Sequence, residues 1–394
     1  MMRFVLFVLV AALLYQGWKW WEAPPAVEPV DQGAVLFQDS QVRTAAPDES
    51  TEQAQARPPL ASPTPQPQAP VPASTLDALL TGVRQGEPSA LAEGFASLLE
   101  ASEPRRSTLV DALDKAATSA GGPTDLLAVL GRGNSFLHSP EGRQLARKTL
   151  GEILKQPADQ AIAHTTKLIE KSMGGVIARQ DTAAFDLVNE IYAKHRSLVR
   201  SVVFNPANLT AARSHKVKSG ETLGGIAETF RLQGYNVEGW TLCIVNRVGQ
   251  PNRLQAGKTI KVPIDPIWVR VEKNSFLMAV YVGELIVRLY WVGHGKDNYT
   301  PETTFLVGEK IPRPDWYAPD GEVYAYGDPK NVLGRYFVKF RHEQYSGFGV
   351  HGTTEPETIR TTASLGCIRL ADADIEEFFH FVPRGAKVEI VSSR

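Results

Sequence analysis

Two short stretches near the C-terminus decide how the chain can be interpreted: residues 348–353 read FGVHGT, and residues 364–370 read SLGCIRL. A cysteine thiol becomes a useful nucleophile only as its thiolate, and a histidine within hydrogen-bond reach can accept the proton. The first stretch contains the histidine, His351, and the second contains the cysteine, Cys367. We therefore expect His351 and Cys367 to form a base–nucleophile pair.

The residues beside Cys367 suit the same chemistry. Gly366 allows a sharp backbone turn, so that neighbouring amides can point at a developing oxyanion. Arg369 supplies a fixed cation for a substrate carboxylate. His342 is an alternative base, but it lacks the Gly-Thr context that follows His351. Each residue alone is weak evidence, because most cysteines, histidines and arginines have structural or solvated roles, and the prediction depends on their combination.

The chain around these stretches alternates apolar and polar residues with a period of two, which is typical of β-strands. The expected strands are residues 267–271, 276–281, 285–292, 336–340 and 386–391. A helix is expected to begin near Asp372 and to stop before Pro383 and Gly385. Residues 266–392 are therefore predicted to form a mostly antiparallel β domain with at least one covering helix.

The combined string His-Gly-Thr and Ser-x-Gly-Cys-Ile-Arg-Leu strongly resembles the catalytic signature of the L,D-transpeptidases, the YkuD family of cell-wall enzymes. Supporting matches are Thr300-Pro301 with Thr304-Phe305, then Asn331-Val332-Leu333-Gly334, and the closing strand at residues 385–390. The sequence departs from the family pattern at three positions, which are Thr303, Val332 and Leu365. None of the three is the expected nucleophile or base.

This resemblance implies that Cys367 is the catalytic nucleophile and His351 the catalytic base. It also implies an oxyanion and substrate-binding site around them, for which the expected residues are Gly352, Thr353, Ser364, Gly366 and Arg369. It implies no metal and no cofactor.

By the same resemblance, Cys367 attacks the carbonyl of the third residue in a donor stem tetrapeptide of peptidoglycan and expels the terminal D-alanine. An acceptor amine of another stem then resolves the thioester and gives a 3→3 cross-link. Water in place of that amine would make an L,D-carboxypeptidase, and a protein amine would make a protein-to-wall attaching enzyme. An alternative of another class is a non-catalytic peptidoglycan-binding scaffold, which the intact His351, Cys367 and Arg369 disfavour.

Residues 213–264 predict a small βααβ module. Val217 is expected to open the first strand, and residues 259–262 to form the last. Two short runs between them have apolar residues at helical spacing, namely Leu223, Ile226 and Phe230, then Val237, Trp240 and Ile244. Cys243 lies within the second run, and we expect it to be a buried, small hydrophobic residue.

The string Ser-Gly-Glu-Thr-Leu at residues 219–223, together with the later Ala256-Gly257, resembles the LysM domain. That family binds glycans containing N-acetylglucosamine in a shallow groove between the loop after the first strand and the loop after the second helix. The glycan-binding residues implied here are Gly220, Glu221, Thr222, Asn246 and Asn252. Glu221 replaces the commoner Asp, and the inter-helix loop at residues 231–238 is longer than usual. An alternative is that these residues only form turns.

Residues 76–205 predict an all-α domain of five to seven helices, because apolar residues recur there at helical spacing. Ser139-Pro140-Glu141 is a typical helix start. The sequence assigns this domain no function. We interpret it as a spacer or as a module that binds a cell-wall protein partner.

The N-terminus predicts export. Residues 1–22 contain Arg3, an apolar stretch and then three tryptophans, which favours an uncleaved anchor in the inner membrane, with a cleaved signal peptide as the alternative. Residues 23–75 hold 11 of the 27 prolines and predict a disordered linker. We therefore expect the protein in the cell envelope, in a periplasmic or other extracytoplasmic compartment.

Composition narrows the remaining classes. The 394 residues are enough for two or three domains. Forty-two Lys+Arg against 43 Asp+Glu leave a net charge of −1, which argues against nucleic acid as a partner. Two cysteines cannot build a disulfide scaffold. Together with the two resemblances, the predicted fold class is multidomain: an anchor with a Pro-rich linker, an all-α domain, a small βααβ LysM domain and a mostly-β catalytic domain. The resemblances imply peptidoglycan as the partner.

Overall fold

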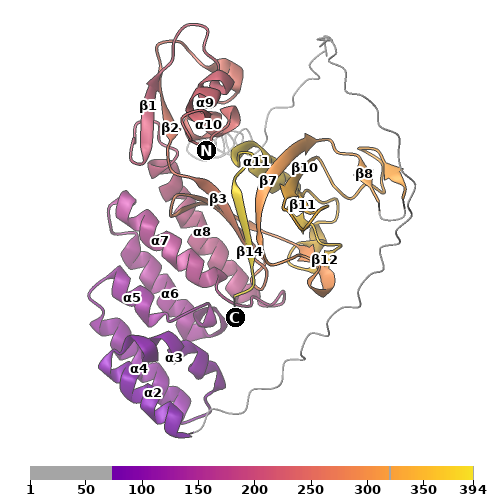
Figure 1. Cartoon of the computed structure of the whole chain (residues 1–394). Coiled ribbons are helices and arrows are strands. Elements are labelled where there is room, and N and C mark those ends of the chain that lie inside the picture. The colour runs from indigo at the N-terminus through magenta and orange to yellow at the C-terminus, as the bar shows by residue number, and fades with distance from the viewer. Residues whose placement is uncertain (1–72, 319–320, 394) are drawn as a thin grey trace, which may run out of the picture. The chain divides into compact units, whose positions relative to one another are not determined.

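The computed structural model describes residues 73–318 and 321–393. The predicted anchor, residues 1–22, and nearly all of the predicted linker, residues 23–75, lie outside these ranges. Among the described residues, no helix combines the length and apolar character that crossing a membrane requires. The described chain consists of a helical region, a βααβ module and a mostly-β domain, in that order (Figure 1).

Seven α-helices lie within residues 73–202 of the described chain, in agreement with the five to seven predicted. They are α2 Ala73–Gln85, α3 Pro88–Glu100, α4 Arg105–Ser119, α5 Pro123–Val129, α6 Pro140–Ile153, α7 Ala158–Met173 and α8 Thr182–Val202, with the 3-10 helix η1 Ser135–His138 before α6. The predicted start at Ser139 is confirmed: its hydroxyl oxygen accepts from the N–H of Gly142 at 3.0 Å, and Pro140 occupies the first helical position.

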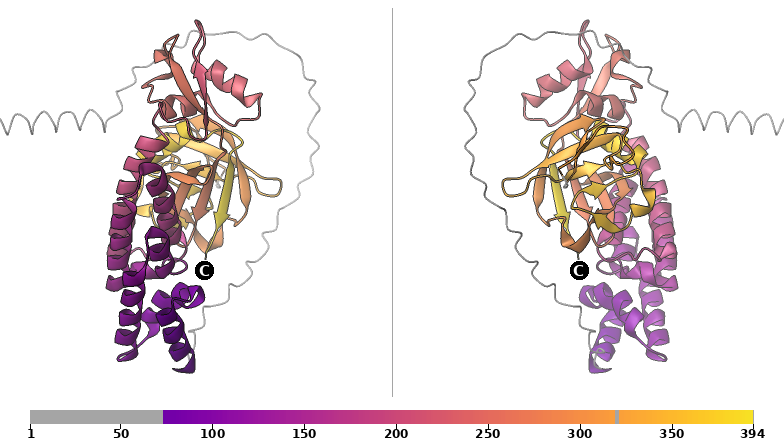
Figure 2. Two further views of the ribbon diagram at one scale, coloured as in Figure 1. Left: turned by 90° about the vertical axis from the view of Figure 1, so that its left-hand side faces the viewer. Right: turned by 90° about the vertical axis from the view of Figure 1, so that its right-hand side faces the viewer.

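The helical region shares a hydrophobic core with the sheet. Tyr281 and Ile286 of the sheet belong to the same buried cluster as the helices. The ring of His195, on α8, donates from Nε2 to the carbonyl of Ile286 at 2.6 Å, while Nδ1 accepts from Thr165 at 2.7 Å. Both views of Figure 2 show the magenta helices against the orange and yellow strands. A detached spacer would lack this interface, so the helical region is a structural layer of the β domain.

The βααβ module has the predicted order of elements. Its elements are β1 Ala212–Lys216, α9 Leu223–Arg231, α10 Gly239–Val245, the 3-10 helix η2 Pro251–Arg253, and β2 Thr259–Pro263, with β1 and β2 antiparallel. The first strand ends before Val217, so the prediction that Val217 opens it is wrong. Val217 instead donates its N–H to the carbonyl of Lys258 at 2.9 Å and is buried in the module's core. Cys243 is buried in the same core, as predicted.

The module is also tied to the helices by a buried lysine. Lys261, on β2, donates from Nζ to the carbonyls of Val203, at 2.8 Å, and Val202, at 3.4 Å. These carbonyls stand at the C-terminus of α8, where helical carbonyls lack partners and a cation is favourable. Burial nevertheless lowers the pKa of Lys261 to about 8.

The β domain is built on one eight-stranded sheet with the order β13-β11-β10-β7-β14-β3-β4-β5. Its strands are β3 Ile267–Glu272, β4 Leu277–Val282, β5 Leu285–Trp291, β7 Thr304–Pro312, β10 Tyr336–Arg341, β11 Gly349–His351, β13 Ile368–Arg369 and β14 Lys387–Val391. Within this sheet only β14 with β3 and β11 with β13 pair in parallel, so it is mostly antiparallel, as predicted. The predicted helix is α11, Asp372–Phe381, which buries Ile375, Phe378 and Phe381 in the core.

Two small strand pairs and two short helices surround this sheet. They are β6 His294–Gly295 with β12 Thr362–Ser364, β8 Trp316–Tyr317 with β9 Val323–Tyr324, and the 3-10 helices η3 Lys296–Asn298 and η4 Pro356–Thr358.

The buried His195 should make the free energy of unfolding depend on pH in the acidic range. Burial lowers its pKa to about 4, outweighing the opposing effect of the bond to Ile286, whereas the unfolded chain titrates near 6.5. The unfolded state therefore binds the proton first, and the free energy of unfolding falls as the pH drops from about 6.5 towards 4. His195→Gln, which can still donate to Ile286, should reduce that slope by about one proton. Chemical denaturation at several pH values measures it; equal slopes would contradict the assignment.

Candidate active site

A parallel strand pair brings the predicted catalytic residues together. In the pairing of β11 with β13, His351 lies opposite Arg369. Because side chains alternate along a strand, these two point to one face of the sheet, and Cys367, two residues before Arg369, points the same way. We call this side of the sheet the Cys367 face. The structure thus places the predicted nucleophile, base and cation together.

One nitrogen of His351 is fixed and the other is available. The buried ring contacts the carbonyl oxygen of Gly352 through Nδ1 at 2.5 Å. A carbonyl can only accept, so Nδ1 carries the proton and Nε2 is the acceptor. Among the described residues, none forms a hydrogen bond with Nε2. Burial lowers the pKa of His351 to about 4, and nearby Arg369 adds to this, so the ring is neutral at pH 7.

Cys367 is protonated in the resting protein. Its thiol is partly exposed and donates to the carbonyl of Gly347 at 3.5 Å. Desolvation raises its pKa to about 11, although the amide of Gly349 and the charge of Arg369 act in the opposite direction. No hydrogen bond joins this thiol to His351 within the described chain. The thiol must therefore turn from Gly347 towards Nε2 before it can be deprotonated.

The turn before Cys367 requires glycine. Gly366 has a φ of +127°, and a Cβ there would lie 2.8 Å from the ring of Phe348. Its own N–H donates to the Ser364 hydroxyl at 3.1 Å, and that hydroxyl donates to the carbonyl of Cys367 at 2.5 Å. Ser364 therefore shapes the turn, and the N–H of Gly366 is occupied, so that an oxyanion donor has to be another amide, such as that of Cys367.

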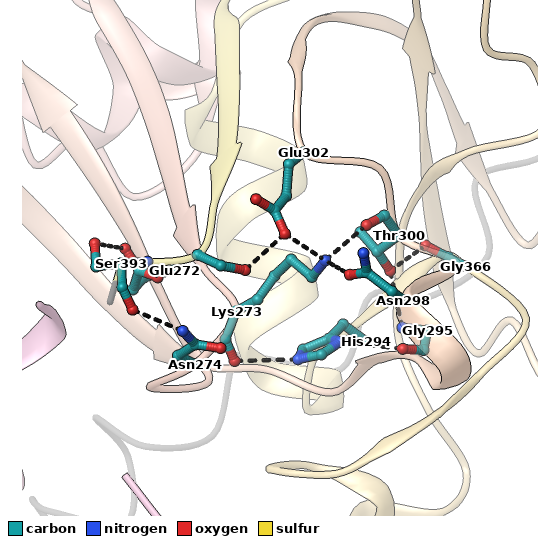
Figure 3. A network of polar contacts seen from close by, with 11 residues as sticks. Glu272, Lys273, Asn274, His294, Gly295, Asn298, Thr300, Glu302, Gly366 and Ser393 are labelled. Carbon is teal, nitrogen blue, oxygen red and sulfur yellow. Dashed lines mark hydrogen bonds and ion pairs between the residues drawn. The ribbon is translucent and has the colours of Figure 1, made fainter. Parts of the chain in front are cut away.

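A buried threonine that the sequence patterns did not reveal supports this turn. The Thr300 hydroxyl accepts from the N–H of Gly295 and donates to the carbonyl of Gly366, both at 2.8 Å (Figure 3). The nearly inaccessible ammonium of Lys273 donates to the Thr300 carbonyl at 3.0 Å. The match of Thr300-Pro301 to a family motif was the available signal, but it gave no indication of this contact.

The predicted substrate-binding residues beside the pair have internal partners. Arg369 forms an ion pair with Glu355 at 3.0 Å, and its own side chain is only 12% exposed. The Thr353 hydroxyl accepts from the N–H of Glu355 at 3.0 Å, so Thr353 positions the partner of Arg369. A side chain at Gly352 would displace the carboxylate of Asp372, since a Cβ would lie 2.6 Å from it.

His342, the alternative base, uses both ring nitrogens elsewhere. Nδ1 accepts from the N–H of Gln344 at 3.0 Å, which leaves Nε2 to donate to the Thr303 hydroxyl at 3.2 Å. This geometry favours His351 as the base.

Two of the five predicted glycan-binding residues have their side chains engaged inside the βααβ module. Asn246 is buried; its amide donates to Leu242 and Lys261, and its oxygen accepts from the N–H of Lys261 at 2.7 Å. The carboxylate of Glu221 accepts from His215 at 2.8 Å and from the Lys218 N–H at 2.7 Å. We therefore correct Asn246 to a structural residue, which is the turn-forming alternative.

The other three predicted residues are exposed. Thr222 caps α9 by accepting from the N–H of Gly225 at 3.1 Å. Gly220, with a φ of +82°, and Asn252 lie on the two loops expected to border the groove. Any glycan contact of the predicted kind would involve these exposed positions.

Known families and proteins match two parts of the chain. The model of the YkuD L,D-transpeptidase catalytic domain matches residues 266–390, and the model of the LysM domain matches residues 215–263. "Putative L,D-transpeptidase YqjB" of Bacillus subtilis is 33% identical over 132 residues, which are 33% of this chain and 73% of that protein. "Putative L,D-transpeptidase YkuD" of Bacillus licheniformis is 28% identical over 183 residues, 45% of this chain and 97% of that protein.

Among solved structures, an L,D-transpeptidase from Mycobacterium smegmatis aligns with 17% identity and a TM-score of 0.28. The alignment covers 34% of this chain and 64% of that one. At this TM-score the likeness carries no further argument.

We call residues 364–367 the cysteine turn. Loss of the Thr300 hydroxyl should reduce local order in this turn. Thr300→Val removes the hydroxyl and leaves the Gly366 carbonyl and the Gly295 N–H without their partner, which costs about 1–3 kcal/mol. Hydrogen exchange of the peptide 364–370 should become about tenfold faster or more, while Thr300→Ser should exchange like wild type. Unchanged exchange in Thr300→Val would contradict the role of the hydroxyl.

The raised pKa of Cys367 predicts its alkylation behaviour. Since the thiolate is the reactive form, the rate of alkylation by iodoacetamide should rise about tenfold per pH unit from pH 7 to 10. Peptide mass spectrometry distinguishes alkylation of Cys367 from alkylation of the buried Cys243. A plateau in the neutral range would instead indicate a preformed thiolate–imidazolium pair and would refute the neutral pair described above.

Proposed function

Because the chain belongs to the YkuD family of L,D-transpeptidases, we propose that it is a cell-envelope enzyme that acylates Cys367 with a peptidoglycan stem peptide and forms 3→3 cross-links. The observation that carries this proposal is the arrangement of His351 on the Cys367 face, where Gly352 fixes Nδ1 and Nε2 has no partner among the described residues. That is the arrangement a general base for a thiol requires.

In the proposed first half-reaction, the thiol of Cys367 attacks the carbonyl of the third stem residue and passes its proton to Nε2 of His351. An amide of the cysteine turn stabilises the developing oxyanion. The imidazolium then protonates the leaving amine, the carbon–nitrogen bond breaks, and D-alanine leaves the thioester. Because the bond to Gly352 keeps the proton on Nδ1, the ring needs no tautomeric change.

In the second half-reaction, an acceptor amine from another stem attacks the thioester, His351 accepts a proton from that amine, and the Cys367 thiol is released with its proton restored. Arg369 would hold a stem carboxylate if the substrate displaces or shares Glu355, its partner in the resting state. An L,D-carboxypeptidase would use water at this step, and a protein-attaching enzyme would use a protein amine; both employ the same residues.

The LysM domain supports the choice of polymer. LysM and L,D-transpeptidase domains both imply peptidoglycan binding, and joining them raises the effective concentration of enzyme on an insoluble substrate. Export and anchoring through residues 1–22 remain part of the proposal. The close packing of the helical region against β5 supports a structural role for it over a protein-partner site.

Acylation is the direct test of the catalytic assignment. A carbapenem should add its mass to the purified protein, Cys367→Ala should show no addition, and His351→Ala should be slower by about 10²–10⁴-fold. Cys243→Ala is the matched control and should react like wild type. A wild-type protein that binds peptidoglycan but is never acylated would establish the scaffold alternative instead.

Incubation with tetrapeptide muropeptides should separate the members of the enzyme class. Cross-linked dimers identified by mass spectrometry are the expected product. Tripeptides without dimers would replace the cross-linking proposal with an L,D-carboxypeptidase.

A further inference from the structure

A cleft of about 900 Å³ lies where the LysM domain meets the β domain. On one side it is lined by α9 and the start of α10, including Arg231 and Trp240. On the other side it is lined by Arg341 and Arg384. None of the five predicted glycan-binding residues lines it, but Pro251, on the loop expected to border the LysM groove, does, so this cleft adjoins that groove.

The walls of the cleft are held by polar contacts that are exposed, partly buried and buried. Glu238, on the long inter-helix loop, accepts from Lys310 at 2.8 Å and from the N–H of Arg384 at 2.9 Å. The hydroxyl of Thr241 donates to the carbonyl of Phe381 at 2.9 Å. Because the Lys310 side chain is only 4% exposed, removing its partner would leave a buried charge. The inter-helix loop, unusual for its length, therefore fixes the shape of the cleft.

The cleft has excess positive charge. Arg231 is neutralised by Glu228 at 2.6 Å. Arg384 and Lys310 share the single carboxylate of Glu238. Arg341 is exposed, and no ion pair or hydrogen bond of its side chain occurs among the described residues. An anionic ligand group would be attracted to Arg341.

The cleft also offers an aromatic surface. Trp240 is 40% exposed and stacks against His380, on α11, with ring centroids 4.3 Å apart. An indole held in this way presents an apolar face beside polar groups, which suits a sugar ring. The chemistry of the cleft thus combines an aromatic platform with the guanidinium of Arg341.

The position of Arg341 relates the cleft to the nucleophile. β10 lies two strands from β13, and Phe337 of β10 is opposite His351, so that Arg341, four residues further on, also points to the Cys367 face. The strand spacing of about 4.8 Å and the rise of about 3.3 Å per residue place the two backbone positions about 12 Å apart. The three stem residues on the glycan side of the attacked bond span about 10–11 Å when extended, which is close to that distance.

We propose that this cleft binds the glycan-proximal part of the donor stem peptide, with a stem carboxylate on Arg341 and the attached sugar against Trp240. The inference rests on the proposed function, because it assumes that the acyl group transferred to Cys367 comes from a stem peptide. It gives the LysM domain a second role, since the domain then supplies one wall of the donor site in addition to holding glycan.

The test compares Arg341→Gln and Trp240→Ala with wild type on disaccharide tetrapeptide, on free tetrapeptide and on a carbapenem. Arg341→Gln should lower kcat/KM about tenfold for both peptides. The rate of carbapenem acylation should stay close to that of wild type. Trp240→Ala should lower kcat/KM for the disaccharide substrate but not for the free peptide. Arg341→Lys should restore part of the loss, and Arg105→Gln, on α4, is the matched control for an exposed arginine.

The outcomes separate this inference from the proposed function. If wild type turns over muropeptides and the two cleft variants match it on every substrate, the cleft is not the donor site. If both variants lose carbapenem acylation as much as peptide turnover, the effect is structural and the inference also fails. If wild type is neither acylated nor active on peptides, the proposed function itself fails.

Discussion

The pairing of β11 with β13 is the constraint on which the site depends. Parallel strands cannot be joined by a tight turn, so the chain needs a long crossover between His351 and Cys367. That crossover contains η4 and β12 and carries Glu355, the partner of Arg369. Local hydrogen bonds shape parts of this crossover, such as those of Thr353 with Glu355 and of Ser364 with Gly366 and Cys367, and other parts of the chain hold it from outside.

Two other parts of the chain hold the crossover. Thr300 bonds the turn at Gly366, and the helical region holds the middle of the crossover. Arg360 donates to the carbonyl of Ala178 at 3.0 Å and stacks on the ring of Phe185, while Arg179 donates to the carbonyl of Glu357 at 2.8 Å. The helical region, through Phe185 of α8 and the loop before that helix, therefore contacts the middle of the crossover directly.

The sequence was informative wherever the signal was local. Alternation predicted the long strands, and the Ser139 cap predicted α6. The pairing of His351 with Cys367 stays a prediction, although the two lie on one face of the sheet. It was uninformative where a role depends on a distant partner: the Thr300 hydroxyl bonds to a residue 66 positions away, and the Asn246 amide to one 15 away. Asn246 shows the limit most clearly, because a polar residue in a loop motif looks the same whether it faces a ligand or its own backbone.

The helices α7 and α8 share a hydrophobic core with the sheet. The residues that match the catalytic-domain family, 266–390, are therefore not a domain that can be separated from the helices. Cutting before residue 266 would expose the apolar surface of β4 and β5, including Tyr281 and Ile286, and would leave β5 as an uncovered edge. Such a fragment would be prone to self-association. The catalytic domain can thus be recognised alone from its sequence, but its solubility is a property of the longer chain that includes the helices.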